Sequence, residues 1–149
     1  PRHDMLEDLL WRMKDLASDL CSANGIAYSV DIPKNIDVLD LSEKLRKNIY
    51  LIFKEAINNI IKHAQAKSVS MRVEIRDSVF EMVIEDDGVG YITDEQHDGL
   101  LVVSEEDDRP VRGHGLRNMA KRAEEIGGKL SVCSTPDKGT TLRLSVSMT

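Results

Sequence analysis

The chain alternates between two hydrophobic periods over its 149 residues. Apolar residues recur at spacings of three and four, which predicts amphipathic helices, in residues 4–23, from a capping box at 40–43 to about 64, and in about 116–126. They alternate with polar residues, which predicts strands, in residues 26–32, 69–75, 79–85, 129–134 and 141–147. This order of elements predicts a two-layer α/β sandwich, in which helices cover one face of a mixed, mainly antiparallel sheet.

Turn and capping residues mark the limits of these elements. Asn24-Gly25 and Gly127-Gly128 have the chemistry of helix C-caps and should end the first and third helices. Asp40 and Glu43 fit a capping box that starts the second helix, which we expect to run to about Ala64. The remaining turns are predicted at residues 76–78 and 135–139.

The first helix, residues 4–23, has two possible interpretations. Its leucines recur close to a heptad, which is typical of the end of a coiled coil or helical bundle. The same stripe also fits a helix that packs on its own domain. Trp11 is interpreted as a packing residue in either case.

Composition and charge narrow the class of protein. The length suffices for one domain with a hydrophobic core, and the 41% hydrophobic content is ordinary for a globular fold. The net charge of −6 argues against a general nucleic-acid binder. Cys21 and Cys133 form no CxxC pair, and no apolar run approaches the roughly 20 residues of a membrane span. We therefore expect a cytoplasmic chain without nucleic-acid or membrane contact, compatible with the cytosolic part of a membrane-anchored sensor. Because it begins at Pro1, we expect a piece of a longer protein.

One face of the second helix carries an unusual set of polar residues. At about 100° per residue, Glu55, Asn59 and Lys62 fall in a narrow arc opposite the apolar stripe, with His63 at its border. An Asn oxygen suits Mg²⁺, a Lys can reach a phosphate, and a Glu can orient or deprotonate a nucleophile. Taken alone, this arc also fits the solvated face of an amphipathic helix.

Two glycine blocks add further candidate chemistry. Asp86-Asp87-Gly88-Val89-Gly90 follows a strand directly, where a carboxylate can accept a hydrogen bond from a base and glycines allow close approach. Arg112-Gly113-His114-Gly115-Leu116 precedes the third helix, whose free N–H groups suit phosphate oxygens. Alone, the first block also fits a plain turn and the second a flexible hinge. Residues 91–112 between them are long and acidic without a clear period, which favours a lid but also fits disorder.

Together these blocks resemble the Bergerat-type ATP-binding fold that histidine kinases share with DNA gyrase, heat-shock chaperones and mismatch-repair ATPases. The stretch 55–63 is similar to the N box of this superfamily, 86–90 to its first glycine box, and 113–116 to its second. Gly139-Thr140-Thr141 is similar to its final box. Within the superfamily, KEAINNIIKHAQA and GHGLRNM most closely resemble bacterial sensor histidine kinases of the nitrate/nitrite-sensor and desaturase-thermosensor type. The resemblance spans about residues 26–147.

The resemblance implies a role for each block. Asp86 would accept the hydrogen bond of the adenine amino group beside Gly88 and Gly90, and Thr140 would support the adenine end through its hydroxyl. Asn59 would hold Mg²⁺ that bridges the phosphates. Glu55 would orient the attacking group. The remaining implied contacts are with the triphosphate: Lys62, His63, and the second glycine box with Gly113, His114, Gly115 and Leu116. Residues 91–112 would be the ATP lid.

The resemblance also implies an activity, which has two rivals. The chain would bind Mg·ATP and donate the γ-phosphate to a histidine on a separate upstream dimerisation domain, acting on a response regulator through the full-length protein. His3-Asp4 is rejected as the acceptor, because it lies immediately before the helix that leads into the ATP-binding fold. Residues 1–24 would be a helical lead-in and residues 25–149 the ATP-binding domain. The rivals are a nucleotide-gated binding module or serine kinase of the anti-sigma-factor type, and a degenerate scaffold.

Overall fold

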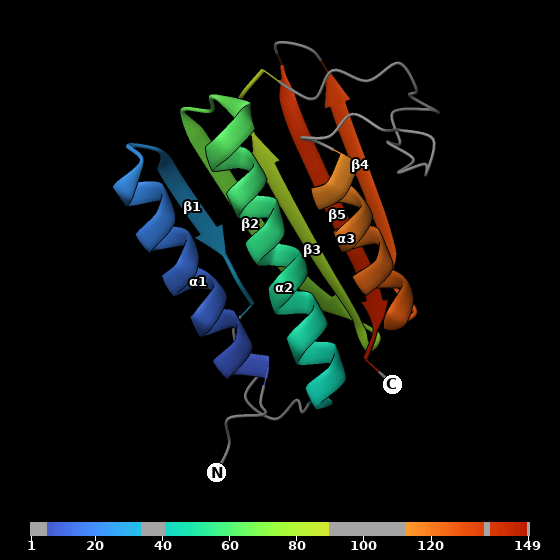
Figure 1. Cartoon of the computed structure of the whole chain (residues 1–149). Coiled ribbons are helices and arrows are strands. Elements are labelled where there is room, and N and C mark those ends of the chain that lie inside the picture. Colours follow the sequence, from blue (N-terminus) through green and yellow to red (C-terminus); the bar gives the residue numbers. More distant parts are fainter. Residues whose placement is uncertain (1–5, 34–40, 90–112, 136–137, 149) are drawn as a thin grey trace.

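A computed structural model describes residues 6–33, 41–89, 113–135 and 138–148. Within these ranges, three α-helices lie side by side on one face of a five-stranded sheet (Figure 1). The helices are α1 (Leu6–Ala23), α2 (Glu43–Asn59) and α3 (Gly113–Glu125), and a π-helical turn, η1 (Ile60–Ala64), continues α2. The strands are β1 (Ala27–Asp31), β2 (Ser68–Arg76), β3 (Val79–Asp86), β4 (Lys129–Thr135) and β5 (Gly139–Ser147).

The sheet has the strand order β1-β2-β3-β5-β4. β1 and β2 are parallel, because α2 carries the chain back to the same end of the sheet, and the other neighbours are antiparallel. The predicted hairpin between β2 and β3 is present, and its turn residues Asp77 and Ser78 both have positive φ, as a type I′ turn requires. The predicted two-layer α/β sandwich with a mixed, mainly antiparallel sheet is confirmed.

The start of β1 is tied to the residue that precedes β2. The Ala27 N–H donates to the Lys67 carbonyl oxygen at 2.9 Å. Ala27 follows the end of α1 closely, after the Gly25 turn with its positive φ of 68°. Consequently a short loop joins α1 to β1, and one backbone hydrogen bond joins the start of β1 to the start of β2.

The hydrophobic core lies between the helices and the covered face of the sheet. Alternate residues of β3 face this core, and the row Phe80, Met82 and Ile84 is almost fully buried. The opposite face of the sheet is polar, with an ion pair of 3.3 Å between Arg143 Nη1 and Glu81 Oε1. Exposed pairs of this kind contribute at most about 1 kcal/mol, so core burial dominates the stability of the fold.

The first helix packs on its own domain. Its apolar stripe is buried against α2 and the sheet, at Leu6, Leu9, Leu10, Met13, Ala17 and Cys21. Trp11, interpreted from the sequence as a packing residue, is 57% exposed, so that interpretation was wrong. It lies on the outer side of α1, where the Lys14 ammonium is 5.7 Å from its ring. Among the described residues, no helix combines the length and apolar character that crossing a membrane requires.

Three helix boundaries differ from the prediction. The N-cap of α2 is Ser42, whose Oγ accepts a hydrogen bond from the Leu45 N–H at 3.1 Å, so the capping box starting at Asp40 was wrong. The regular α-helix ends at Asn59, and η1 and the left-handed Gln65 (φ 53°) follow it. α3 begins at Gly113 rather than Leu116, so the glycines of the second block form its first turn.

Candidate functional site

Two apolar rows of the sheet end in polar residues at the same place. The row of β3 that faces the helices ends at Asp86, and the corresponding row of β5 begins at Thr140. The strand register pairs Asp86 directly with Thr140. A carboxyl and a hydroxyl therefore lie side by side at one end of the covered face, as the sequence-based site requires.

These two residues border a narrow hollow between α2 and the sheet. Its walls are otherwise apolar and come from α2, η1 and three strands: Ala56, Ile60, Ile84, Val132 and Leu142. The hollow holds about 10 Å³, enough for roughly one water-sized sphere. A flat base could enter only if these walls move apart. An apolar slot with a few convergent polar groups is the usual form of a small-molecule site.

The Asp86 carboxyl is held in a defined orientation. Its Oδ1 accepts a hydrogen bond from the Gly88 N–H at 2.8 Å. Burial raises the pKa of this carboxyl, and the nearby charge of Asp87 raises it further, while the N–H groups of Gly88 and Thr140 act in the opposite direction. Gly88 of the first glycine block thus contributes its backbone to the site, whereas Gly90 lies outside the described residues.

Gly139 allows β5 to approach Asp86 closely. Its φ of 101° lies in the region that favours glycine, and a Cβ at this position would be 2.0 Å from the Asp86 carbonyl oxygen. No other residue fits here without displacing the end of β3. The resemblance placed this glycine in the final box, and the structure supplies the physical reason for it.

Asn59, on the polar face of α2, lies toward α3 rather than toward solvent. The Arg12 guanidinium of α1 lies 4.8 Å from the centre of the Tyr50 ring, which fixes the side of α2 that faces α1. Asn59 is two and a half turns further along the helix, so it lies on the side of α2 opposite to Tyr50. Figure 1 shows α1 and α3 on opposite sides of α2, so this side faces α3. Asn59 is only 6% exposed, while Glu55 is half-buried and Lys62 is exposed. The alternative interpretation of this arc, as the solvated face of an amphipathic helix, therefore does not hold for Asn59.

Asn59 carries an unusual buried polar atom. Its Nδ2 has no hydrogen-bond partner within the described part of the chain. Buried amides are normally satisfied, so an unpaired one at a site marks a place for a polar ligand. An amide can also rotate to present its oxygen.

The donor set fits Mg²⁺ that is bound together with phosphates. Among the described residues, no three His, Cys, Asp or Glu side chains gather to hold a metal ion. Mg²⁺ commonly takes one or two protein oxygens and completes its shell with phosphates and water. The Asn59 amide oxygen, with the Glu55 carboxylate one helical turn away, suits that arrangement better than a protein-only metal site.

The first turn of α3 lies at the same end of the molecule. The end of α2, the start of α3 and the end of β3 all point to this end (Figure 1). N–H groups in the first turn of a helix lack partners within the helix and favour anions. Gly113, His114, Gly115 and Leu116 form this turn. The side chains of His63, His114 and Leu116 and the segment 91–112 lie outside what the structure describes.

Asp87, for which the sequence predicted no role, lies directly beside the site and is held by several hydrogen bonds. Its carboxylate accepts hydrogen bonds from the N–H groups of Lys67 and Ser68 and from the Ser68 hydroxyl. It thus connects the end of β3 with the beginning of β2. Only its position directly after a strand and before a glycine signalled such a bond in the sequence.

Comparison with known families agrees with this geometry. Residues 45–149 match the family described as histidine kinase-, DNA gyrase B-, and HSP90-like ATPases. The chain belongs to this ATPase family. The matched range contains every box identified in the sequence, and the predicted resemblance is confirmed.

The relatives of this ATPase domain are sensor histidine kinases. It is 34% identical to an uncharacterized sensor-like histidine kinase of Chloroflexus aurantiacus, over 75% of the chain and 18% of that protein. It is also 34% identical to the histidine-protein kinase/phosphatase UhpB of Salmonella typhimurium, over 85% of the chain and 21% of that protein. The chain thus spans about a fifth of these two relatives. The catalytic domain of the histidine kinase ThkA has the same fold, with a TM-score of 0.73 at 17% identity, covering 97% of this chain and 94% of that one.

Proposed function

We propose that this chain is the ATP-binding catalytic part of a two-component sensor histidine kinase. It binds Mg·ATP and donates the γ-phosphate to a histidine on a separate upstream dimerisation domain. The observation that carries the proposal is the Asp86 carboxyl, held beside Thr140 at the end of an apolar hollow. The names of the relatives favour this activity over a module of the anti-sigma-factor type.

Asp86 and Thr140 form the base end of the proposed site. The Asp86 carboxylate accepts a hydrogen bond from the exocyclic amino group of adenine, which guanine does not present at that position. Thr140 supports the same end through its hydroxyl, and the apolar walls contact the faces of the ring. Gly88 and Gly90 let the backbone pass close to the base.

Asn59 and the helix ends form the phosphate end of the proposed site. The Asn59 oxygen would hold Mg²⁺, which would neutralise phosphate charge when bound. Lys62 and His63 lie against the phosphates, and the first turn of α3 (Gly113, His114, Gly115 and Leu116) presents backbone N–H groups to them. Residues 91–112 close over the nucleotide as a lid.

The transfer step is mainly one of positioning. A nitrogen of the acceptor histidine attacks the γ-phosphorus, the bond from this phosphorus to the β–γ bridging oxygen breaks, and ADP leaves. Glu55, half-buried one helical turn before Asn59, orients the attacking group. The helix α1 leads in from the dimerisation domain, and the full-length protein serves a response regulator. The chain works in the cytoplasm in this proposal.

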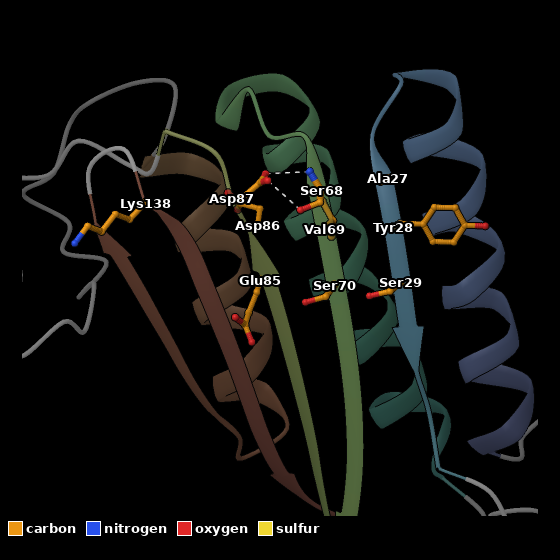
Figure 2. A pocket seen from close by; sticks show the side chains of 10 residues that line it. All are labelled: Ala27, Tyr28, Ser29, Ser68, Val69, Ser70, Glu85, Asp86, Asp87 and Lys138. Atoms are coloured by element: carbon orange, nitrogen blue, oxygen red, sulfur yellow. Dashed lines mark hydrogen bonds between the residues drawn. The ribbon is translucent and has the colours of Figure 1, made fainter.

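The base end is tested by titrating ATP with Mg²⁺ into the chain and two variants. Asp86→Ala removes the charged acceptor and should weaken ATP binding roughly 10- to 100-fold, since a hydrogen bond to a charged group contributes about 1.5–3 kcal/mol. Glu85→Ala is the matched control, because the exposed Glu85 precedes Asp86 on the same strand and points to the opposite face (Figure 2). Absence of ATP binding to the unchanged chain at millimolar concentration would overturn the proposed function.

The phosphate end is tested separately. Asn59→Ala should lose mainly the Mg²⁺-dependent part of ATP affinity. In the full-length kinase, Glu55→Gln should keep ATP binding but slow phosphate transfer to the acceptor histidine by about 100-fold, as removal of a general acid–base group does. If Asn59→Ala bound ATP as tightly as the unchanged chain does in the presence of Mg²⁺, Asn59 would be excluded as the ligand.

A further inference from the structure

Asp87 makes an unusually complete set of hydrogen bonds for an exposed side chain. Its Oδ1 accepts the Lys67 N–H at 2.8 Å and the Ser68 N–H at 2.9 Å. Its Oδ2 accepts the Ser68 hydroxyl at 3.0 Å. Figure 2 shows the carboxylate reaching from the end of β3 to Ser68 on the neighbouring strand. These three bonds are called the Asp87 clasp below.

The Asp87 clasp replaces the next step of the β-ladder. In a continued antiparallel ladder, Ser68 and Asp87 would exchange two backbone hydrogen bonds. The Asp87 N–H still approaches the Ser68 carbonyl at 3.4 Å, but the Ser68 N–H donates to the Asp87 carboxylate. The side chain thus takes the place of its own backbone carbonyl, so the chain can leave the sheet immediately after Asp86.

The point at which the chain leaves the sheet determines the orientation of the Asp86 carboxyl. Because the backbone turns at Asp87, the Gly88 N–H folds back onto Asp86 Oδ1 at 2.8 Å. On the other side of β3, Gly139 of β5 packs against the Asp86 carbonyl. Asp86 is therefore held from both neighbouring strands, by the clasp on the β2 side and by close packing on the β5 side.

We propose that Asp87 is a positioning residue that fixes the direction of the Asp86 carboxyl toward the adenine ring. The inference deepens the proposed function and rests on it. Asp87 touches no nucleotide atom in this arrangement, since its carboxylate is directed at β2. Its effect passes through the turn at Gly88.

The electrostatics of the clasp agree with this role. The N–H groups of Ser68 and Lys67 hold the pKa of the Asp87 carboxyl below its ordinary value. The clasp therefore keeps its acceptor charge over a wider acidic range than an unbonded Asp would. Asp87 also borders a second hollow, and the other charged residues that line it, among those the structure describes, are Glu85, Asp86 and Lys138 (Figure 2).

Three variants of the chain remove different numbers of the hydrogen bonds of the Asp87 clasp. Asp87→Ala removes all three bonds and should weaken adenosine binding about tenfold, the equivalent of about 1.4 kcal/mol. Ser68→Ala removes one bond and should weaken it about threefold. Asp87→Asn keeps an oxygen that can accept both N–H groups and should bind within about twofold of the unchanged chain.

Two further measurements separate positioning from general destabilisation. Affinity for tripolyphosphate with Mg²⁺ should stay unchanged in all three variants, because the phosphate end is built on other elements. Hydrogen exchange of the Gly88 amide, followed by NMR without nucleotide, should accelerate in Asp87→Ala and remain slow in Asp87→Asn.

The outcomes distinguish this inference from the proposed function. If the unchanged chain binds adenosine, Asp86→Ala binds it at least tenfold more weakly, and Asp87→Ala binds it as the unchanged chain does, the positioning role is wrong and the function stands. Equal weakening for adenosine and tripolyphosphate in Asp87→Ala would also overturn positioning. If the unchanged chain binds neither ATP nor adenosine, the proposed function fails, and the positioning role fails with it.

Discussion

The two ends of the proposed ATP site are built in opposite ways. The base end lies on paired strands, where Asp86 accepts from Gly88, Asp87 accepts from two N–H groups, and Gly139 packs against the backbone. The phosphate end lies at the ends of two helices, where Asn59 buries an amide whose Nδ2 has no partner among the described residues. One end has its polar groups bonded in advance, and the other keeps a polar group unpaired.

This difference suits the two parts of a nucleotide. Adenine is recognised by the direction of a few hydrogen bonds, so an acceptor that is already oriented gives selectivity. Magnesium and phosphates bring strong charges with them and can satisfy groups that the protein leaves unpaired. We therefore expect changes at the base end to alter structure and selectivity together. Changes at the phosphate end should alter binding while stability stays the same or increases.

The largest expected effect is a loss of stability when a side chain is added at Gly139. In Gly139→Ala the new Cβ would lie 2.0 Å from the Asp86 carbonyl, which we expect to lower the free energy of unfolding by about 3 kcal/mol or more. Gly127→Ala is the matched control, since Gly127 also has positive φ but open space around it. It should lose only about 1–2 kcal/mol. Equal losses in urea unfolding would contradict the close-packing argument.

A smaller effect of opposite sign is expected at the phosphate end. Asn59→Leu removes a buried amide with an unpaired atom and should raise the free energy of unfolding by about 1 kcal/mol. The same variant should lose Mg²⁺-dependent ATP binding. Asn58→Leu, at a half-buried neighbouring position, should change neither quantity much. A destabilised Asn59→Leu would show that the amide is satisfied in solution, and the contrast between the two ends would disappear.

The smallest expected effect is on how the free energy of unfolding depends on pH. Asp86 and Asp87 should contribute to this dependence with opposite signs. Burial raises the folded-state pKa of Asp86 above 3.8, so its contribution to stability is present below pH 3.8 and is lost as pH rises through the folded pKa. Asp87 has a lowered pKa, so its contribution is present above pH 3.8 and is lost as pH falls through the folded pKa. Relative to the unchanged chain, Asp86→Asn should gain stability from pH 3 to 7, and Asp87→Asn should lose it. Urea unfolding at several pH values checks this, and slopes of the same sign would contradict it.

The order of elements and the Asp86–Thr140 end could be predicted from the sequence. Alternation along β3 and β5 is strong, because one face of each strand is buried, and it places Asp86 and Thr140 on the covered face. The strand register that brings them together depends on long-range pairing, which no local pattern encodes. The resemblance of the boxes supplied that information, since it relates residues that are far apart in the chain.

The phosphate end was harder to predict because helix neighbours decide it. A regular helix puts Asn59 opposite the apolar stripe, but packing between α1 and α3 buries both flanks of α2. The π-helical turn after Asn59 changes the angular positions that a period of 3.6 residues assigns to Lys62 and His63. Ser42 and Asp40 are both acceptable caps, and only the observed hydrogen bond to Leu45 distinguishes them.

The peptide group that joins Lys67 to Ser68 links two distant parts of the molecule. Its carbonyl accepts from Ala27, just beyond the end of α1, and its N–H donates to the Asp87 carboxylate. A peptide group is a rigid plane, so it cannot tilt at one bond without tilting at the other. One rigid peptide group therefore couples the segment that follows α1 to the Asp87 clasp, so a displacement of either one tilts the hydrogen bond of the other.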